Sequence, residues 1–210
     1  MNPDKVDRSI FPTKELDRSI CYTNRVRKSV NAFWMKKYAP EEKMILGQAP
    51  KVKQSQDMTI FIGLPLVAMK SRSKYEMYNA DRFVVTDFNR RTVTIRHVDD
   101  KEVEYDDEIK IPTCEVTRIL QPAYCVTLHR MQGVSIDRPF TIYEWSKFDR
   151  NAKEGAFHTF KYVALSRSRR LKYINIAKDR DDDDDDDEDE GEDDEDDEDD
   201  YEMEIEIIEG

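Results

Sequence analysis

The chain has 210 residues, enough for one domain with a small insertion, and its formal net charge is −12. Half of the 46 Asp and Glu residues lie at or after position 181, so residues 1–180 are basic, with a formal net charge of about +11. No stretch reaches the ~20 apolar residues of a membrane span, and the N-terminus lacks the apolar core of a secretory signal. We therefore expect neither a membrane protein nor a secreted one, but an intracellular protein.

Residues 19–24 predict a short buried strand that ends in a polar turn. Residues 25–38 predict a helix whose apolar residues fall on one face, and Ala39-Pro40 ends it: Val26, Val30, Phe33 and Trp34 form this face. A strand, a turn and a helix are the start of an α/β unit.

The pattern changes to short β runs between residues 58 and 117. The first run is 60–70, and residues 83–87 and 92–96 predict a hairpin. Two further short strands are predicted at 102–105 and 109–111. About five short strands in this space predict a small barrel inserted into the α/β framework.

The α/β pattern then resumes, with strands predicted at 123–128, 140–143 and 173–177 and a helix at 161–168. The predicted fold class is therefore an α/β domain that carries a small all-β barrel and an acidic tail. The expected boundaries are residues 1–57 and 118–180 for the α/β domain, 58–117 for the barrel and 181–210 for the tail.

The tail is acidic at every position of 181–200 except Gly191. Such a run cannot bury enough apolar surface to order itself, so we predict disorder. Two interpretations stay open: a solubilising extension, or a mimic of nucleic acid that competes for the basic body. The three cysteines lack paired spacing, which argues against disulfides or zinc and fits a reducing compartment.

A run of polar residues and a glycine follows the predicted strand 123–128: His129, Arg130, Gln132 and Gly133. Ligands of open α/β sheets bind at the carboxyl ends of strands, and backbone N–H groups of a following turn point at an anion there. Thr127 and Ser135 add hydroxyl groups for a phosphate oxygen. His129 alone would more often be structural, but its neighbours favour a binding role.

Arg167 lies on the predicted helix 161–168 among apolar residues. A cation in this place is suited to neutralise the negative charge of a ligand. If the ligand is a nucleoside triphosphate, such an arginine stabilises charge on the transferred phosphoryl group. Arg169 and Arg170 are expected to lie on a solvated face and to contribute only to the electrostatic field.

These segments resemble the motifs of superfamily 1 helicases of the RecD/UvrD-like group. Residues 127–135, TLHRMQGVS, resemble motif V, commonly T-x-H-K-x-Q-G-x-[ST], and residues 162–167, YVALSR, match motif VI. Residues 21–24 with Asn31 resemble motif IV, and 63–67 resemble the opening of the barrel in the second RecA-like domain of this group. The resemblance covers roughly residues 19–177 and is nearest to helicases of large DNA viruses. Arg130 stands where lysine is usual, and 78–81 replace the common N-G-[DE].

The resemblance implies roles for particular residues. Arg167 would be the catalytic arginine that reaches the γ-phosphate, and Gln132 and Gly133 would bind nucleotide beside it. The remaining matched residues would lie on a track for single-stranded DNA, with RNA as the alternative ligand: Asn24, Thr127, His129, Arg130 and Ser135. The resemblance also implies that the α/β domain is RecA-like. The basic body supplies the salt-dependent affinity that such a track needs.

The sequence holds no G-x-x-x-x-G-K-[ST] phosphate loop and no apolar strand that ends in Asp-Glu for Mg²⁺. ATP and Mg²⁺ are therefore expected only in a composite site, completed by a first RecA-like domain in the same gene or a separate chain. Three interpretations remain: the C-terminal half of an ATP-dependent DNA helicase, inactive alone; a nucleic-acid-binding module without catalysis; or a protein-interaction module that works through its tail. The resemblance places the protein in the cytoplasm, the nucleus or a viral replication site.

Overall fold

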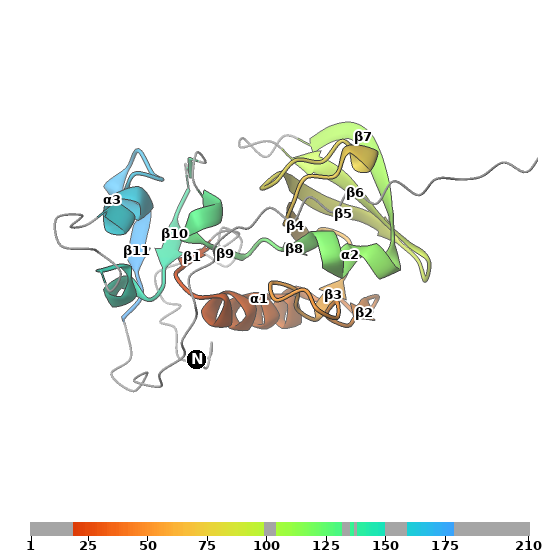
Figure 1. The fold of residues 1–210 in the computed structure, drawn as a ribbon, viewed down its shortest axis with the longest axis horizontal. Helices are drawn as coiled ribbons and strands as arrows, with labels where there is room; N and C mark the ends of the chain where they lie inside the picture. Colours follow the sequence, from red (N-terminus) through yellow and green to blue (C-terminus); the bar gives the residue numbers. More distant parts are fainter. Residues whose placement is uncertain (1–18, 99–103, 132–134, 137, 150–158, 179–210) are drawn as a thin grey trace, which may run out of the picture.

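The structure, a computed structural model, describes residues 19–98, 104–131, 135–136, 138–149 and 159–178. The strands of these residues form a parallel sheet, an antiparallel sheet and a separate two-stranded pair. Figure 1 shows the parallel sheet on the left, the antiparallel sheet on the upper right and a long helix, α1, below. The predicted acidic tail, 181–210, lies outside the described residues.

The parallel sheet has the strand order β11-β10-β1-β9, so the first described strand lies between strands from the far end of the chain. All three of its pairings are parallel. This arrangement confirms the predicted mixed α/β class with a parallel sheet. Each strand has three residues, fewer than predicted: β1 (Ser19–Cys21), β9 (Cys125–Thr127), β10 (Phe140–Ile142) and β11 (Ile174–Ile176).

Helix α1 (Asn24–Tyr38) begins directly after β1, as predicted. Thr23 is its N-cap residue, because its hydroxyl accepts a hydrogen bond from the backbone N–H of Val26 at 3.3 Å. The helix buries Val26, Val30 and Trp34, whereas Phe33 is half-buried. Its C-cap is Ala39, since the following proline cannot continue the helix.

The antiparallel sheet has the order β7-β6-β5-β4-β8. Its described strands run from β7 at one edge to β8 at the other: β4 (Pro65–Ala68), β5 (Arg82–Phe88), β6 (Thr92–Val98), β7 (Glu104–Pro112) and β8 (Leu120–Pro122). The predicted hairpin is confirmed as β5 and β6. Residues 104–105 and 109–111 are in a strand, as predicted, but they belong to one strand, β7, and not to two; it pairs with β6 with one shift in register. Residues 102–103 lie outside the described residues.

Three further elements have no counterpart in the sequence-based prediction: β2 (Met44–Leu46), β3 (Met58–Ile60) and the short helix α2 (Thr113–Ile119). β2 and β3 pair with each other, so residues 58–60 stand apart from the antiparallel sheet. Helix α2 leads from β7 into β8 and has no side-chain cap at its N-terminus. The chain then passes from β8 through Ala123 and Tyr124 directly into β9 of the parallel sheet.

Two buried apolar clusters stabilise these sheets. The first joins α1 to the antiparallel sheet and includes Cys21 and Cys125 of the parallel sheet. The second lies at the parallel sheet and contains Ile20, Phe140 and Ile142. None of the helices in the described part of the chain combines the length and apolar character needed to cross a membrane.

Candidate functional site

The carboxyl ends of β1 and β9 lie side by side, because Cys21 pairs in register with Thr127. Thr127 is buried, and the chain continues from it into a 3-10 helix, η3 (Leu128–Met131). His129 on this helix is exposed, with its ring edge-on to Phe160 at a centroid distance of 5.3 Å. The structure therefore places Thr127 and His129 at the predicted edge of the sheet.

Arg167 follows helix α3 (Thr159–Leu165) rather than lying on it, because the helix ends before Ser166. The helix predicted at 161–168 is therefore too long at its C-terminal end. The hydroxyl of Ser166 donates to the carbonyl of Val163 at 2.9 Å. The backbone N–H of Ser166 donates to the carbonyl of Tyr162 at 2.8 Å. Arg167 is thus held in a turn.

The side chain of Arg167 connects this turn to the end of η3. Its Nε donates to the carbonyl of Val163 at 2.9 Å, and its Nη1 donates to the carbonyl of Met131 at 3.0 Å. In return, the N–H of Ile136 donates to the carbonyl of Arg167 at 2.6 Å. The two segments that carry the motif resemblances are therefore hydrogen-bonded to each other through Arg167.

Gln132 and Gly133, the other residues expected to bind nucleotide, lie outside the described residues. Ser135 is described and exposed, close in sequence to the Ile136 that bonds to Arg167. Among the described residues, no group of His, Cys, Asp and Glu side chains is arranged to hold a metal ion.

Asn24, the first residue of α1, uses its side chain within the protein. Its Oδ1 accepts from Nε of Arg27 at 2.9 Å. Arg27 is fully buried, and its other nitrogens donate to the carbonyl of Gln54 at 2.7 Å and to Oε1 of Gln56 at 3.1 Å. Asn24 therefore helps to orient a buried arginine at the start of the helix.

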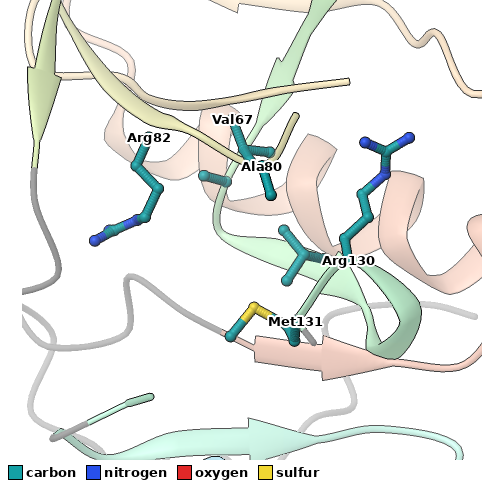
Figure 2. A pocket seen from close by; sticks show the side chains of 7 residues that line it. Val67, Ala80, Arg82, Arg130 and Met131 are labelled. Atoms are coloured by element: carbon teal, nitrogen blue, oxygen red, sulfur yellow. The ribbon is translucent and has the colours of Figure 1, made fainter. Parts of the chain in front are cut away.

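Arg130 extends from η3 to the antiparallel sheet. Its guanidinium donates to the carbonyls of Met69 at 2.9 Å and Ala68 at 3.4 Å, and to the side chains of Asn79 and Gln54. A small pocket lies beside it, and Figure 2 shows that Arg82 and Arg130 are directed away from each other there. The walls are mostly apolar: Val67, Ala80, Arg82, Ala123, Val126, Arg130 and Met131 line the pocket.

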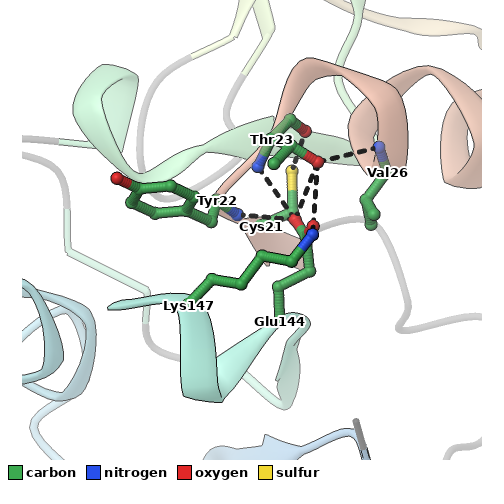
Figure 3. A network of polar contacts seen from close by, with 6 residues as sticks. All are labelled: Cys21, Tyr22, Thr23, Val26, Glu144 and Lys147. Atoms are coloured by element: carbon green, nitrogen blue, oxygen red, sulfur yellow. Dashed lines mark hydrogen bonds and ion pairs between the residues drawn. The ribbon is translucent and has the colours of Figure 1, made fainter. Parts of the chain in front are cut away.

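A buried carboxylate at the same edge of the sheet was missed by the sequence-based prediction. Glu144, which follows β10, is 4% exposed. It accepts from the N–H groups of Tyr22 at 3.1 Å and Thr23 at 2.8 Å, and from the Thr23 hydroxyl (Figure 3). Lys147 lies 3.2 Å from it. Glu144 thus supplies a negative charge at the N-terminus of α1, where the helix dipole favours an anion.

The buried thiol of Cys21 belongs to the same network, and Figure 3 shows its sulfur beside Thr23 and the carboxylate of Glu144. It donates to the carbonyl of Thr23 at 3.3 Å. Burial, followed by the interactions with Cys125, raises its pKa well above the usual value. Cys21 is therefore a neutral packing residue rather than a nucleophile.

No family model matches the chain, and no curated protein matches it. Solved structures of Pif1 helicases do match. Pif1 from Bacteroides bound to single-stranded DNA is 20% identical, with a TM-score of 0.54 over 81% of this chain and 42% of that chain. The Pif1 helicase from Candida albicans is 12% identical, with a TM-score of 0.53 over 80% of this chain and 46% of that chain.

These likenesses show the fold: the chain folds like a part of the Pif1 helicases. A third Pif1 structure, concerned with unwinding at forked double-stranded DNA, is 20% identical with a TM-score of 0.53. It is matched over 80% of this chain and 40% of its own length. The chain therefore spans less than half the length of the helicases that it resembles.

Proposed function

We propose that this chain is the C-terminal half of an ATP-dependent DNA helicase of the RecD/UvrD-like group, similar to those of large DNA viruses. It would supply an arginine finger and part of a track for single-stranded DNA. The observation that carries the proposal is the position of Arg167, which hydrogen-bonds the end of η3 to the turn after α3. The shared fold with Pif1 helicases, one of them bound to single-stranded DNA, supports it.

Arg167 is suited to act on a phosphoryl group held by another domain. Its bonds to the carbonyls of Val163 and Met131 fix the direction of the side chain before any ligand arrives. A prepositioned guanidinium stabilises the charge that develops on the transferred phosphoryl group, which contributes ~10³–10⁵ to the rate. Gln132 and Gly133 are assigned to the same nucleotide site by the resemblance of residues 127–135 to helicase motif V.

ATP and Mg²⁺ would occupy a composite site between this chain and a first RecA-like domain, encoded in the same gene or separately. Arg167 fits the phosphate side of such a site because its planar fork matches phosphate oxygens. Mg²⁺, which would offset the charge of the phosphates, would be held by residues of the other domain; the described residues of this chain contain no cluster of metal ligands.

The proposed track crosses the carboxyl edge of the parallel sheet. The exposed ring of His129, supported by Phe160, offers a surface on which a base can stack. Ser135 adds an exposed hydroxyl for a phosphate oxygen. Thr127 and Asn24 position the edge beneath them, and Arg130 borders it. Single-stranded DNA is the proposed ligand, with RNA as an outcome to be compared.

The test is ATP hydrolysis by the chain combined with a first RecA-like domain that carries a phosphate loop. Arg167→Ala should lower kcat by about 10³ or more, the usual contribution of an arginine finger. Arg169→Ala is the matched control, because that side chain is exposed two residues away. An unchanged kcat for Arg167→Ala would refute the assignment, and a thermal melt of each variant shows that the fold is kept.

The absence of a phosphate-loop motif in the sequence favours one alternative, a non-enzymatic module that binds nucleic acid or protein. Such a module would bind single strands with strong salt dependence and would not stimulate ATP hydrolysis by any first domain. Deleting residues 181–210 distinguishes a module that binds nucleic acid from a module that binds protein through the tail. Loss of partner binding with nucleic-acid binding intact would identify a protein-interaction module that works through the tail.

A further inference from the structure

We propose that Arg130 is a positioning residue that fixes the antiparallel sheet against the carboxyl edge of the parallel sheet. It would thereby set the shape of the nucleic-acid surface without contacting phosphate. Its effect on nucleic-acid binding rests on the proposed function, whereas its effect on the arrangement of the two sheets does not.

The backbone of Arg130 and its side chain belong to different parts of the fold. Its backbone lies on η3, directly after β9 of the parallel sheet. Its guanidinium donates to the carbonyls of Ala68 and Met69, where β4 of the antiparallel sheet ends. It also donates to Oδ1 of Asn79 at 3.2 Å, shortly before β5 begins. One side chain therefore joins two sheets.

Arginine is required for this arrangement. The guanidinium presents five N–H donors in a rigid fork, so it can bond to acceptors on several segments at once. The three donors of a lysine ammonium sit on one atom, and that atom cannot reach acceptors that lie on both sides of the fork. This accounts for arginine at a position where the resembling helicase motif usually has lysine.

Gln54 extends the connection from Arg130 to α1. The Oε1 of Gln54 accepts from Arg130, while its backbone carbonyl accepts from the buried Arg27 of α1 at 2.7 Å. On the same helix, Asn31 bonds to both backbone groups of Cys125 in β9, at 2.8 and 3.0 Å. These hydrogen bonds join η3, α1 and β9 in a closed set. Because Arg130 is held to α1 in this way, its bonds to the carbonyls of Ala68 and Met69 also hold the antiparallel sheet in place.

Apolar packing is thin at the place where Arg130 lies. Among the described residues, Val67 is the member of the antiparallel sheet that joins the buried cluster of the parallel sheet. The pocket lies directly beside it, lined by Val67, Ala80 and Met131 (Figure 2). Arg130 therefore adds polar bonds between the two sheets at this place, beside the apolar cluster in which Cys21 and Cys125 pack with the antiparallel sheet.

The first experiment measures the arrangement of the sheets by the distance between two spin labels. Labels at Asp87→Cys on β5 and Lys172→Cys beside β11 are exposed, and Cys114→Ser removes the exposed native thiol. We expect a narrow distance distribution for the parent protein, a broad one for Arg130→Ala and partial recovery for Arg130→Lys. Arg90→Ala, which changes an exposed arginine in the turn between β5 and β6, is the control. An unchanged distribution for Arg130→Ala would overturn the proposal.

The second experiment measures binding of a single-stranded oligonucleotide as a function of salt. Loss of one phosphate contact lowers the slope of log K against log salt by about 0.7. A positioning residue instead lowers affinity, by about tenfold or about 1.4 kcal/mol, with the slope unchanged. A lowered slope with a narrow label distribution would identify Arg130 as a phosphate contact and overturn the proposal.

Gln54→Ala provides an independent variant that keeps the charge of Arg130. It removes the side-chain acceptor through which Arg130 is joined to Gln54 and α1. We therefore expect it to broaden the label distribution and to weaken oligonucleotide binding, as Arg130→Ala does. If Gln54→Ala changes neither, the proposal is wrong even where Arg130→Ala fails to fold. If the parent protein binds no oligonucleotide, the proposed track fails while the label distances still test the positioning role.

Discussion

The two sheets of this molecule complete their hydrogen bonds in different ways. In the antiparallel sheet, β5 and β6 are joined by a tight turn in which the N–H of Asn89 donates to the carbonyl of Thr92 at 2.9 Å. In the parallel sheet, β1 pairs with strands from the far end of the chain. The ends of its three-residue strands therefore receive partners from distant segments, among them Glu144 and Asn31.

This difference explains why the candidate site lies at the parallel sheet. At these strand ends the backbone N–H groups form hydrogen bonds with side chains of other segments. Side chains from several segments therefore lie close together at one edge of the sheet. Two contacts show this: Arg167, in the turn after α3, bonds to Met131 of η3, and His129 of η3 packs against Phe160 of α3. The antiparallel sheet is more nearly self-contained, and we infer that it mainly supports and shapes the site.

The largest loss of stability is expected from alanine substitutions in the two apolar clusters. These variants also test whether the two sheets unfold as one unit. Ile95 in β6 and Ile142 in β10 are both fully buried, so each Ile→Ala substitution should lower the free energy of unfolding by about 3–4 kcal/mol. Trp34 reports on the cluster at the antiparallel sheet, and Trp145 on the cluster at the parallel sheet. Single-tryptophan variants allow each region to be followed in urea.

We expect the two tryptophan transitions to coincide in both alanine variants. The reason is that Cys21 and Cys125 of the parallel sheet belong to the same apolar cluster as the antiparallel sheet. Two separate midpoints, with Ile95→Ala moving only the Trp34 transition, would show that the sheets are independent units.

The next effect concerns the buried carboxylate. Glu144→Gln keeps the shape of the side chain but replaces one acceptor oxygen by an amide that faces the N–H groups of Tyr22 and Thr23. The free energy of unfolding should fall by about 2–3 kcal/mol, as expected for hydrogen bonds to a buried charge. Chemical denaturation measures this change.

Glu108→Gln is the matched control on the antiparallel sheet. Glu108 lies 3.0 Å from Arg96, but its side chain is 43% exposed. An exposed ion pair contributes at most about 1 kcal/mol, so this variant should be close to the parent protein. Equal losses for the two variants would contradict the structural role assigned to Glu144.

The regular elements could be predicted because their residues carry local patterns. The apolar residues at alternate positions of β5 and β6 (Phe83 and Val85, Val93 and Ile95) and the apolar face of α1 are visible in short windows of sequence. The sequence predicts the strands of the parallel sheet at the right places but makes them longer than three residues. The reason is that apolar, buried residues continue along the chain beyond the residues that pair, as at Leu128 and Tyr143. The short β2 and α2 carry no comparable periodicity.

The site was only partly predictable for a related reason. His129 and Arg167 stand in recognisable segments, whereas Glu144 and Gln54 acquire their roles from segments far away in the sequence. Glu144 also has a positive φ of 58°, which few residues other than glycine adopt. A charged, buried residue in such a conformation runs against every local preference, so sequence patterns give no sign of it.

The smallest expected effect is a dependence of stability on alkaline pH. Cys21 has a pKa above the usual 9.0 because it is buried, so the folded state keeps its proton when the unfolded state loses it. The unfolded state then binds fewer protons, and stability falls as pH rises above about 9. At about pH 10 the loss from this thiol should reach about 1.4 kcal/mol.

Cys21→Ala removes this contribution, and Cys114→Ser, which changes an exposed thiol, is the control. Urea denaturation at pH 7.5 and pH 10 should show a smaller loss for Cys21→Ala than for the parent protein, and no change in that loss for Cys114→Ser. Tyrosine and lysine titrations are the same in all three proteins and cancel in the comparison. An identical loss in all three would mean that the edge of the parallel sheet opens enough to hydrate Cys21. The hydrogen bonds of the Glu144 carboxylate would then not keep water from the end of β1, whereas the hairpin of the antiparallel sheet completes its own hydrogen bonds.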